Sequence, residues 1–394
     1  MRFPFPSAVA VAALAAIPQA TAIATDIDQW DVLAGKALAN QVLYQFTKPR
    51  YTDSECTPFN AAVRREWGTL SKQERKEYID AVICLTESPS QIDPALAPGA
   101  RTRYDDFVAV HINQTLRIHT TGNFLTWHRY FTWAYEQALR NECGYTGYQP
   151  YWAWGKYADD LLNSPIFDGS EYSMSGDGLY IPHDGPEIFT GLFLEPGNGG
   201  GCVTSGPFKK CILHPIPSLT VNLGPLFVTL NVPGVKAQNG TGLESNPRCL
   251  RRDINADAAK WTTDAHVTDL ITNYRDISSF QNRLQGDFDN GYVGVHTGGH
   301  YTIGGDPAGD FYASPGDPAF FLHHAAIDRV FWTWQNLDPA TRTFVVHGPT
   351  LLPGRGPSPN ATLDDVQYFD VLAQDRTIRE LLDTTAGPFC YVYL

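Results

Sequence analysis

The 394-residue sequence predicts a helical fold with long loops and a few short strands. Three observations lead to this prediction. Apolar residues recur at helical spacing on both sides of the middle of the chain. The middle itself, Ser164–Pro247, is rich in Gly, Pro, Asn and Ser, which indicates loops with short strands such as Leu226–Val232. The whole chain holds 34 glycines and 28 prolines, as expected for a protein with many turns.

Two helices are predicted before the middle segment, and a third follows it. One face of the first helix carries four residues at the spacing i, i+3, i+4 and i+7, namely Tyr104, Phe107, Val108 and His111. The second helix runs over Phe124–Asn141 and is expected to end at Gly144, because glycine readily adopts the left-handed conformation that stops a helix. Asp276 and Gly286 bracket the third helix.

A fourth helix and a turn-rich end complete the chain. Asp317 followed by Pro318 places a capping carboxylate before a proline at the first helical position. This pair predicts a helix through about Trp334. From Thr343 onward, short strand-like runs alternate with turns, and one more helix is predicted around Thr377–Leu382.

Residues 1–22 have the features of a secretory signal peptide. Arg2 supplies a positive start, Ala8–Ile17 an apolar core, and Ala20-Thr21-Ala22 a small-x-small cleavage pattern. A membrane anchor would need roughly 20 unbroken apolar residues, and Pro18 interrupts this run. We therefore expect a secreted, extracellular protein.

The charge argues against two classes of partner, and the glycosylation signals agree with secretion. The net charge is −13 and no basic cluster occurs, which argues against nucleic acid and anionic membranes as partners. Three acceptor sequons are present, beginning at Asn113, Asn239 and Asn360. The sequence does not predict which of them carry carbohydrate.

Seven cysteines fit an oxidising compartment, with up to three disulfides and one thiol left over. Cys202 and Cys211 are the best candidate pair because they flank a short loop with Gly and Pro. No CxxC occurs, so a zinc ribbon or a thioredoxin-type site has no support.

Six of the eleven histidines form two compact clusters, and these carry the candidate chemistry: His111, His119 and His128, then His296, His300 and His324. His296 and His300 are four residues apart, so on a helix both rings leave the same face and can share one metal ion. Three imidazoles per metal suit copper, although zinc could use the same ligands. No HExxH motif of a zinc protease occurs. The other isolated histidines are expected to be ordinary core or surface residues: His183, His214, His266 and His347.

Two long motifs resemble the copper motifs of tyrosinases, catechol oxidases and hemocyanins. The first is His119-Thr-Thr-Gly-Asn-Phe-Leu-Thr-Trp-His128-Arg129, continuing to Glu136; the second is His296-Thr-Gly-Gly-His300 with Asp317-Pro-Ala-Phe-Phe-Leu-His-His324 and Asp328-Arg329. They cover about residues 105–335. The end of the chain, Tyr391-Val-Tyr393, resembles the tyrosine motif that closes the family's catalytic domain. The overall pattern looks most like the short fungal polyphenol oxidases.

The resemblance implies a mainly α fold in which a four-helix bundle presents three histidines to each of two copper ions. It implies one domain, 23–394, without a C-terminal domain that shields the site, and small phenols and O2 as partners. The implied ligands are His111, His119 and His128 for one copper and His296, His300 and His324 for the other. Adjacent rings point about 100° apart on a helix, so His323 is expected to be hydrogen-bonded beside the site rather than a ligand.

Several positions depart from the family pattern or qualify it. Arg117 stands where many relatives have a cysteine joined to the second histidine, so no thioether to His119 is expected. Thr297 and Gln285 stand where relatives that hydroxylate monophenols often have Asn and a water-holding Glu. Phe311 falls at the family's gating position and should restrict large substrates. Asp328, one turn after His324, could orient a histidine nitrogen or form a surface i,i+4 pair.

These departures favour oxidation of o-diphenols to o-quinones over hydroxylation of monophenols, since a neutral amide cannot serve as a general base. The alternatives are a tyrosinase, an o-aminophenol oxidase and, from another class, a hemocyanin-like O2 carrier. The sequence predicts neither the natural phenol nor the oligomeric state.

Overall fold

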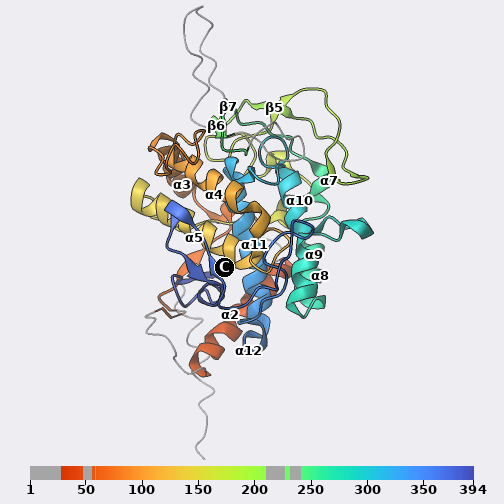
Figure 1. The fold of residues 1–394 in the computed structure, drawn as a ribbon. Coiled ribbons are helices and arrows are strands. Elements are labelled where there is room, and N and C mark those ends of the chain that lie inside the picture. The colour runs from red at the N-terminus through yellow and green to blue at the C-terminus, as the bar shows by residue number, and fades with distance from the viewer. Residues whose placement is uncertain (1–27, 48–55, 58, 210–226, 231–240) are drawn as a thin grey trace, which may run out of the picture.

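The computed structural model describes residues 28–47, 56–57, 59–209, 227–230 and 241–394 (Figure 1). The predicted signal segment 1–22 lies outside the described residues, as do Cys211, His214 and Asn239. In the part that is described, no helix is both long enough and apolar enough to span a bilayer.

Four helices form a bundle at the centre of the molecule (Figure 1): α4 (Arg103–Ile118), α5 (Phe124–Cys143), α10 (Gly294–Ile303) and α11 (Ala319–Leu337). Helix α5 contacts both α4 and α11, and α11 contacts α10. Helix α11 is buried along nearly its whole length. The predicted mainly α fold with a four-helix bundle is therefore confirmed.

The capping signals that predicted the helices are present in the structure. Gly144 has φ +70° and ends α5, as a residue without Cβ does most easily. The Asp276 side chain accepts a hydrogen bond from the backbone N–H of Ser279 and begins α9 (Ile277–Gln285). The Asp317 carboxylate accepts from the backbone N–H of Ala319 at 2.9 Å and begins α11.

Three further helices of ten or more residues enclose the bundle, and the sequence analysis did not predict them: α2 (Gln29–Thr47), α3 (Lys72–Glu87) and α8 (Asp264–Asn273). Helix α2 packs on α11 and α8, and α3 packs on α5 and α4. Short helices and 3-10 turns connect these elements: α6 (Trp154–Tyr157), α7 (Ala256–Ala259), α12 (Pro339–Arg342), η1 (Trp67–Thr69), η2 (Leu161–Asn163), η3 (Phe288–Asn290), η4 (Ser314–Gly316) and η5 (Asp370–Leu372).

The middle of the chain consists of loops and short antiparallel strand pairs, as predicted. The pairs are β2 (Gly178–Tyr180) with β5 (Gly200–Val203), β3 (Glu187–Phe189) with β4 (Leu192–Phe193), and β6 (Phe227–Leu230) with β7 (Ser245–Cys249). Strand β6 lies within the predicted strand Leu226–Val232.

Three disulfides join the described cysteines: Cys56–Cys390, Cys84–Cys143 and Cys202–Cys249. The predicted pair of Cys202 with Cys211 is therefore wrong. Cys202 lies on β5, where it forms a β-bridge with Arg251, and this pairing brings it to a Cα–Cα distance of 5.7 Å from Cys249. The disulfide partner of Cys202 is therefore determined by backbone pairing between distant segments and not by closeness in the sequence.

The last strand of the chain pairs with the first. Strand β10 (Tyr391–Tyr393) pairs in parallel with β1 (Ala62–Arg64), and the disulfide of Cys56 with Cys390 closes the same junction. The helix predicted around Thr377–Leu382 is a single 3-10 turn, η6 (Ile378–Leu381), which follows the short pair β8 (Val366–Gln367) and β9 (Arg376–Thr377).

Candidate metal centre

The first histidine triplet lies between α4 and α5. His111 is on α4, His119 is the residue that ends α4, and His128 is on α5. Their ring centroids are 5.1–5.6 Å apart. In each ring Nδ1 contacts a backbone carbonyl: Tyr312 O at 2.6 Å from His111, Thr115 O at 3.0 Å from His119, and Phe124 O at 2.8 Å from His128.

These carbonyls determine the tautomer of each ring. A carbonyl can only accept a hydrogen bond, so Nδ1 carries the proton and Nε2 keeps a free lone pair. The Nε2 atoms of His111 and His128 are buried and have no hydrogen-bond partner among the described residues. Leaving a buried acceptor without a partner costs about 1–3 kcal/mol. A metal ion among these lone pairs would remove that cost.

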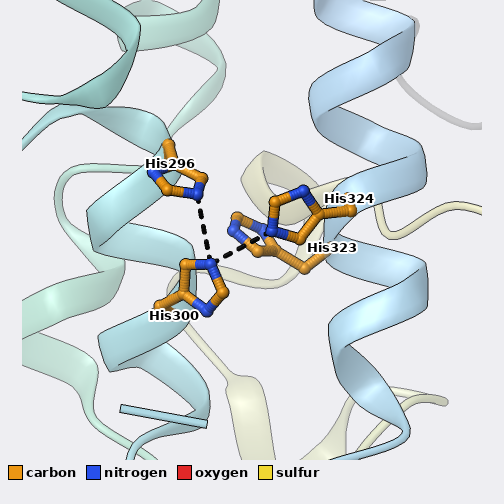
Figure 2. Close-up of side chains that lie close together, drawn as sticks. All are labelled: His296, His300, His323 and His324. Atoms are coloured by element: carbon orange, nitrogen blue, oxygen red, sulfur yellow. Dashed lines mark hydrogen bonds between the residues drawn. The ribbon is translucent and has the colours of Figure 1, made fainter. Parts of the chain in front are cut away.

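The second triplet lies between α10 and α11. His296 and His300 project from α10 toward His324 on α11, as Figure 2 shows. The Nε2 atom of His300 lies 3.2 Å from Nε2 of His296 and 3.1 Å from Nε2 of His324. His300 Nδ1 contacts the carbonyl of Ala308 at 3.2 Å. The Nε2 atom of His300 is therefore an acceptor, and three ring nitrogens converge on one point.

The two triplets face each other inside aromatic walls. The rings of His128 and His324 stack at 4.5 Å, and His119 lies 6.3 Å from His296. The Phe124 ring lies 4.7 Å from His296, and the Phe320 ring stacks on His324 at 4.1 Å. Neither phenylalanine was predicted from the sequence to be part of the site. Apolar rings therefore line the space between the two triplets.

Burial lowers the pKa of every one of these histidines. For His119 the pKa falls to about 4 and for His300 to about 3, with loss of solvation as the largest cause in both. Near neutral pH the rings are therefore neutral, which is the form that binds metal ions. Two groups of metal-ligand type result, one of three histidines and one of four that includes His323. An all-imidazole donor set fits copper.

His323 does not have the hydrogen bonds that were expected for it. Neither ring nitrogen has a partner of normal geometry in the described part of the chain. Burial and, after it, the neighbouring His300 lower the pKa of His323, and the His296 backbone carbonyl opposes this lowering. The ring is held instead by packing, with its centroid 5.4 Å from that of Trp154.

Asp328 also differs from both expectations, since it neither orients a histidine nor lies on the surface. It is 3% exposed, and Arg129 donates to its Oδ1 at 2.5 Å. The hydroxyls of Tyr391 and Tyr393 donate to its Oδ2 at 2.5 and 2.7 Å, and Arg64 lies 3.5 Å away. One helical turn after His324, the side chain points away from the ring nitrogens and toward β10.

Gln285, Thr297 and Phe311 lie around the triplets. The Gln285 side-chain oxygen accepts from the backbone N–H of Thr120 at 2.8 Å, beside His119. The Thr297 hydroxyl donates to the Gln285 backbone carbonyl at 2.7 Å. Phe311 packs its ring 4.6 Å from that of His119 and is 37% exposed, so it lies where the site meets solvent.

One loop, in which only Phe311 was predicted to belong to the site, contacts both triplets. Residues 304–313 supply the carbonyls that hold His111 and His300, and Phe311 belongs to the same loop. Asp310 stabilises it by accepting from the backbone N–H groups of Tyr312 and Ala313. Aspartate is common in turns, so Asp310 was the feature of the sequence from which this turn could have been predicted.

The remaining described histidines lie apart from the two triplets. His183 contacts Asp253 at 2.8 Å, His266 packs on Trp261, and His347 is exposed. Their expected roles as core or surface residues agree with these positions.

Comparison with known proteins shows several close matches. Residues 101–337 match the family model described as the common central domain of tyrosinase. Tyrosinase P of Aspergillus terreus is 40% identical over 338 residues, which cover 84% of this chain and 91% of that protein. An N-acetyl-6-hydroxytryptophan oxidase of Emericella nidulans is 38% identical over 354 residues, covering 86% and 94%. A variant of a polyphenol oxidase from Thermothelomyces thermophila superposes with a TM-score of 0.84 at 41% identity, covering 93% of this chain and 97% of that one.

Proposed function

Because the chain belongs to the tyrosinase family of type-3 copper proteins, we propose that it is a secreted polyphenol oxidase that converts o-diphenols to o-quinones with O2. Two diphenols lose two electrons and two protons each, and one O2 is reduced to two waters. When bound, the copper pair supplies this electron transfer.

The residues of the chain hold and shield the metal ions. His111, His119 and His128 are proposed to bind one copper, and His296, His300 and His324 the other, all through Nε2. Backbone carbonyls orient four of the six rings, which keeps their lone pairs directed inward. The aromatic walls exclude water, and Phe311 limits the width of the approach to His119.

The observation that favours diphenols is that neither Gln285 nor Thr297 offers a side chain that can act as a base. A monophenol has a pKa near 10, as in tyrosine, and must lose its proton before it is hydroxylated. The side chain at 285 is an amide, and its oxygen is already bound to the backbone of Thr120. Thr297 directs its hydroxyl to a backbone carbonyl. Neither residue can accept the phenol proton, whereas a catechol, already more acidic, reacts without such a base.

Other activities remain as alternatives to be tested. A tyrosinase would hydroxylate monophenols, an o-aminophenol oxidase would prefer aminophenols, and a hemocyanin-like carrier would bind O2 without turnover. The relative named as an N-acetyl-6-hydroxytryptophan oxidase adds hydroxyindoles as a second substrate class. Hydroxyindoles are bulkier than catechol, so Phe311 at the site's edge favours the smaller phenols.

The test is to mix the copper-loaded protein with catechol, tyrosol, o-aminophenol or a hydroxyindole and to record oxygen uptake. Catechol should react at once. Tyrosol should react after a long lag or about a hundredfold to ten-thousandfold more slowly, the usual cost of a missing general base. Gln285→Glu combined with Thr297→Asn should raise tyrosol turnover and change catechol turnover little.

A matched variant, Phe311→Ala, tests the width of the entrance separately from the deprotonation of the phenol. It should help bulky phenols more than catechol and should not shorten the lag with tyrosol. Equal wild-type rates on tyramine and dopamine without a lag would contradict the proposal. The base would then be sought at Asp287 or Asp289, in the loop before His296.

Secretion is proposed on separate grounds. The start of the chain has the features of a signal peptide, and the three disulfides of the described residues fit an oxidising compartment. We expect the mature domain to begin near Ile23 and to extend through Leu394. Asn113 and Asn360 are exposed and accessible for glycosylation.

A further inference from the structure

His323 is a buried polar residue without a polar function in the structure. It is fully buried, and neither ring nitrogen has a hydrogen-bond partner of normal geometry among the residues described, although the His296 backbone carbonyl lies near enough to affect its pKa. Its ring centroid lies 4.6 Å from that of His300 and 5.8 Å from that of His296. Figure 2 shows it beside His324, with its ring in the space between α10 and α11. Its position points to a role in packing between these two helices.

Gly299 provides the space that the His323 ring occupies. A Cβ atom placed on Gly299 would lie 2.2 Å from Cε1 and 2.4 Å from Nδ1 of His323. Carbon atoms in contact are normally about 3.5–4.0 Å apart. Gly299 lies between His296 and His300 on α10, so the ring packs against the helix at the point where it presents its two histidines.

The His323 ring also packs against a tryptophan. Its centroid lies 5.4 Å from that of Trp154, which is fully buried and stacks on Trp30 with centroids 5.7 Å apart. Two packed indole rings resist displacement, because protein interiors have few voids. A side chain added at Gly299 would therefore move α10 relative to α11 by roughly 1 Å, the shortfall from normal contact.

We propose that His323 and Gly299 act as a positioning pair that sets the distance between α10 and α11. This distance determines how closely the Nε2 atoms of His296 and His300 approach that of His324, now 3.1–3.2 Å between neighbours. Metal sites tolerate deviations of only about 0.2 Å in ligand distance. The inference rests on the proposed function, because it assumes that this triplet holds the second copper.

The test is a pair of variants, Gly299→Ala and Gly299→Ala combined with His323→Ala. The first should bind about one copper per chain in place of two, and anomalous scattering should place the remaining ion among His111, His119 and His128. Catechol turnover should fall about a hundredfold or more, as expected for a misplacement of 1 Å. The second variant removes the obstructing ring and should again bind two coppers.

Gly298→Ala is the matched control. Its Cβ would approach Trp261 and Thr262 on the other side of α10, at 2.9 and 3.2 Å. None of the atoms nearest to this Cβ belongs to His323, so the variant should lower the melting temperature without loss of copper. Two coppers in Gly299→Ala would overturn the inference, and so would a double variant that fails to fold or to regain the second copper. If the wild type binds two coppers but does not oxidise catechol, the proposed function fails while the copper counts still test the positioning pair.

Discussion

At the scale of single residues, the free lone pairs of the histidines determine what the site can bind. Each Nδ1 of the first triplet is held by a backbone carbonyl, so Nε2 remains as the acceptor. The ring positions could be predicted because the spacing of histidines is visible in the sequence. The carbonyls of Tyr312 and Ala308 could not be predicted as their partners. Every residue carries a carbonyl, and only the fold determines which one contacts a histidine ring.

The first prediction concerns His128 and His300. Replacing either with Ala removes one coordinating nitrogen and should lower the copper content by about one ion per chain. Oxygen uptake with catechol should be abolished, together with the near-ultraviolet absorption of the oxygenated protein. Copper content by atomic absorption checks the first effect.

His347→Ala is the control for these two variants, because the side chain is exposed and lies apart from both triplets. It should keep two coppers and full turnover. Full activity and copper content in His128→Ala or His300→Ala would contradict the ligand assignment.

At the scale of elements, helices with a clear apolar face and a cap were predictable, and those without one were not. Helices α4 and α5 have both signals. Helix α3 has a capping box, in which Ser71 and Glu74 bond each other's backbone, so its start is also visible in the sequence. Helix α2 buries Trp30, small alanines and even Gln41 against α11, so its inner face is not distinctly apolar in the sequence.

The second prediction concerns the junction of β10 with the bundle. Asp328 accepts from Arg129 and from both tyrosines of β10, and all four side chains are buried. Asp328→Ala leaves Arg129 without its carboxylate, which should cost about 3–5 kcal/mol of unfolding free energy. Denaturant unfolding of the copper-free protein measures this cost.

Asp364→Ala is the corresponding surface control. Asp364 pairs with Arg379, and the two side chains are 79% and 51% exposed. Exposed ion pairs contribute at most about 1 kcal/mol, so the loss should be small. Equal losses in the two variants would show that the buried cluster does not stabilise the junction.

At the scale of the whole molecule, long-range connections were the part least predictable from the sequence. The partner of Cys202 lies 47 residues away, on a strand whose pairing only the folded chain reveals. The parallel pairing of β1 with β10 joins segments that are more than 300 residues apart. The two histidine motifs, by contrast, made the four-helix bundle predictable, because the residues of each motif lie close together in the sequence.

The third prediction is a map of covalent links in the secreted protein. Peptide mapping should find the pairs Cys202–Cys249, Cys84–Cys143 and Cys56–Cys390, and a new N-terminus near Ile23. No cysteine should be linked to His119, since Arg117 occupies the position of the usual thioether. A crosslinked peptide that contains His119 would refute the last expectation.

The disulfide of Cys56 with Cys390 has a consequence for the response of the molecule to mechanical force. Its two cysteines are separated by 334 residues in the sequence, and they lie beside the pairing of β1 with β10. Tension applied at the two ends of the chain would therefore pass through the disulfide bond. The segment between Cys56 and Cys390 would not be stretched. In an optical trap, the segment before Cys56, which includes α2, and strand β10 after Cys390 could be pulled out, whereas the chain enclosed between the two cysteines could not be extended until a reductant cut the bond.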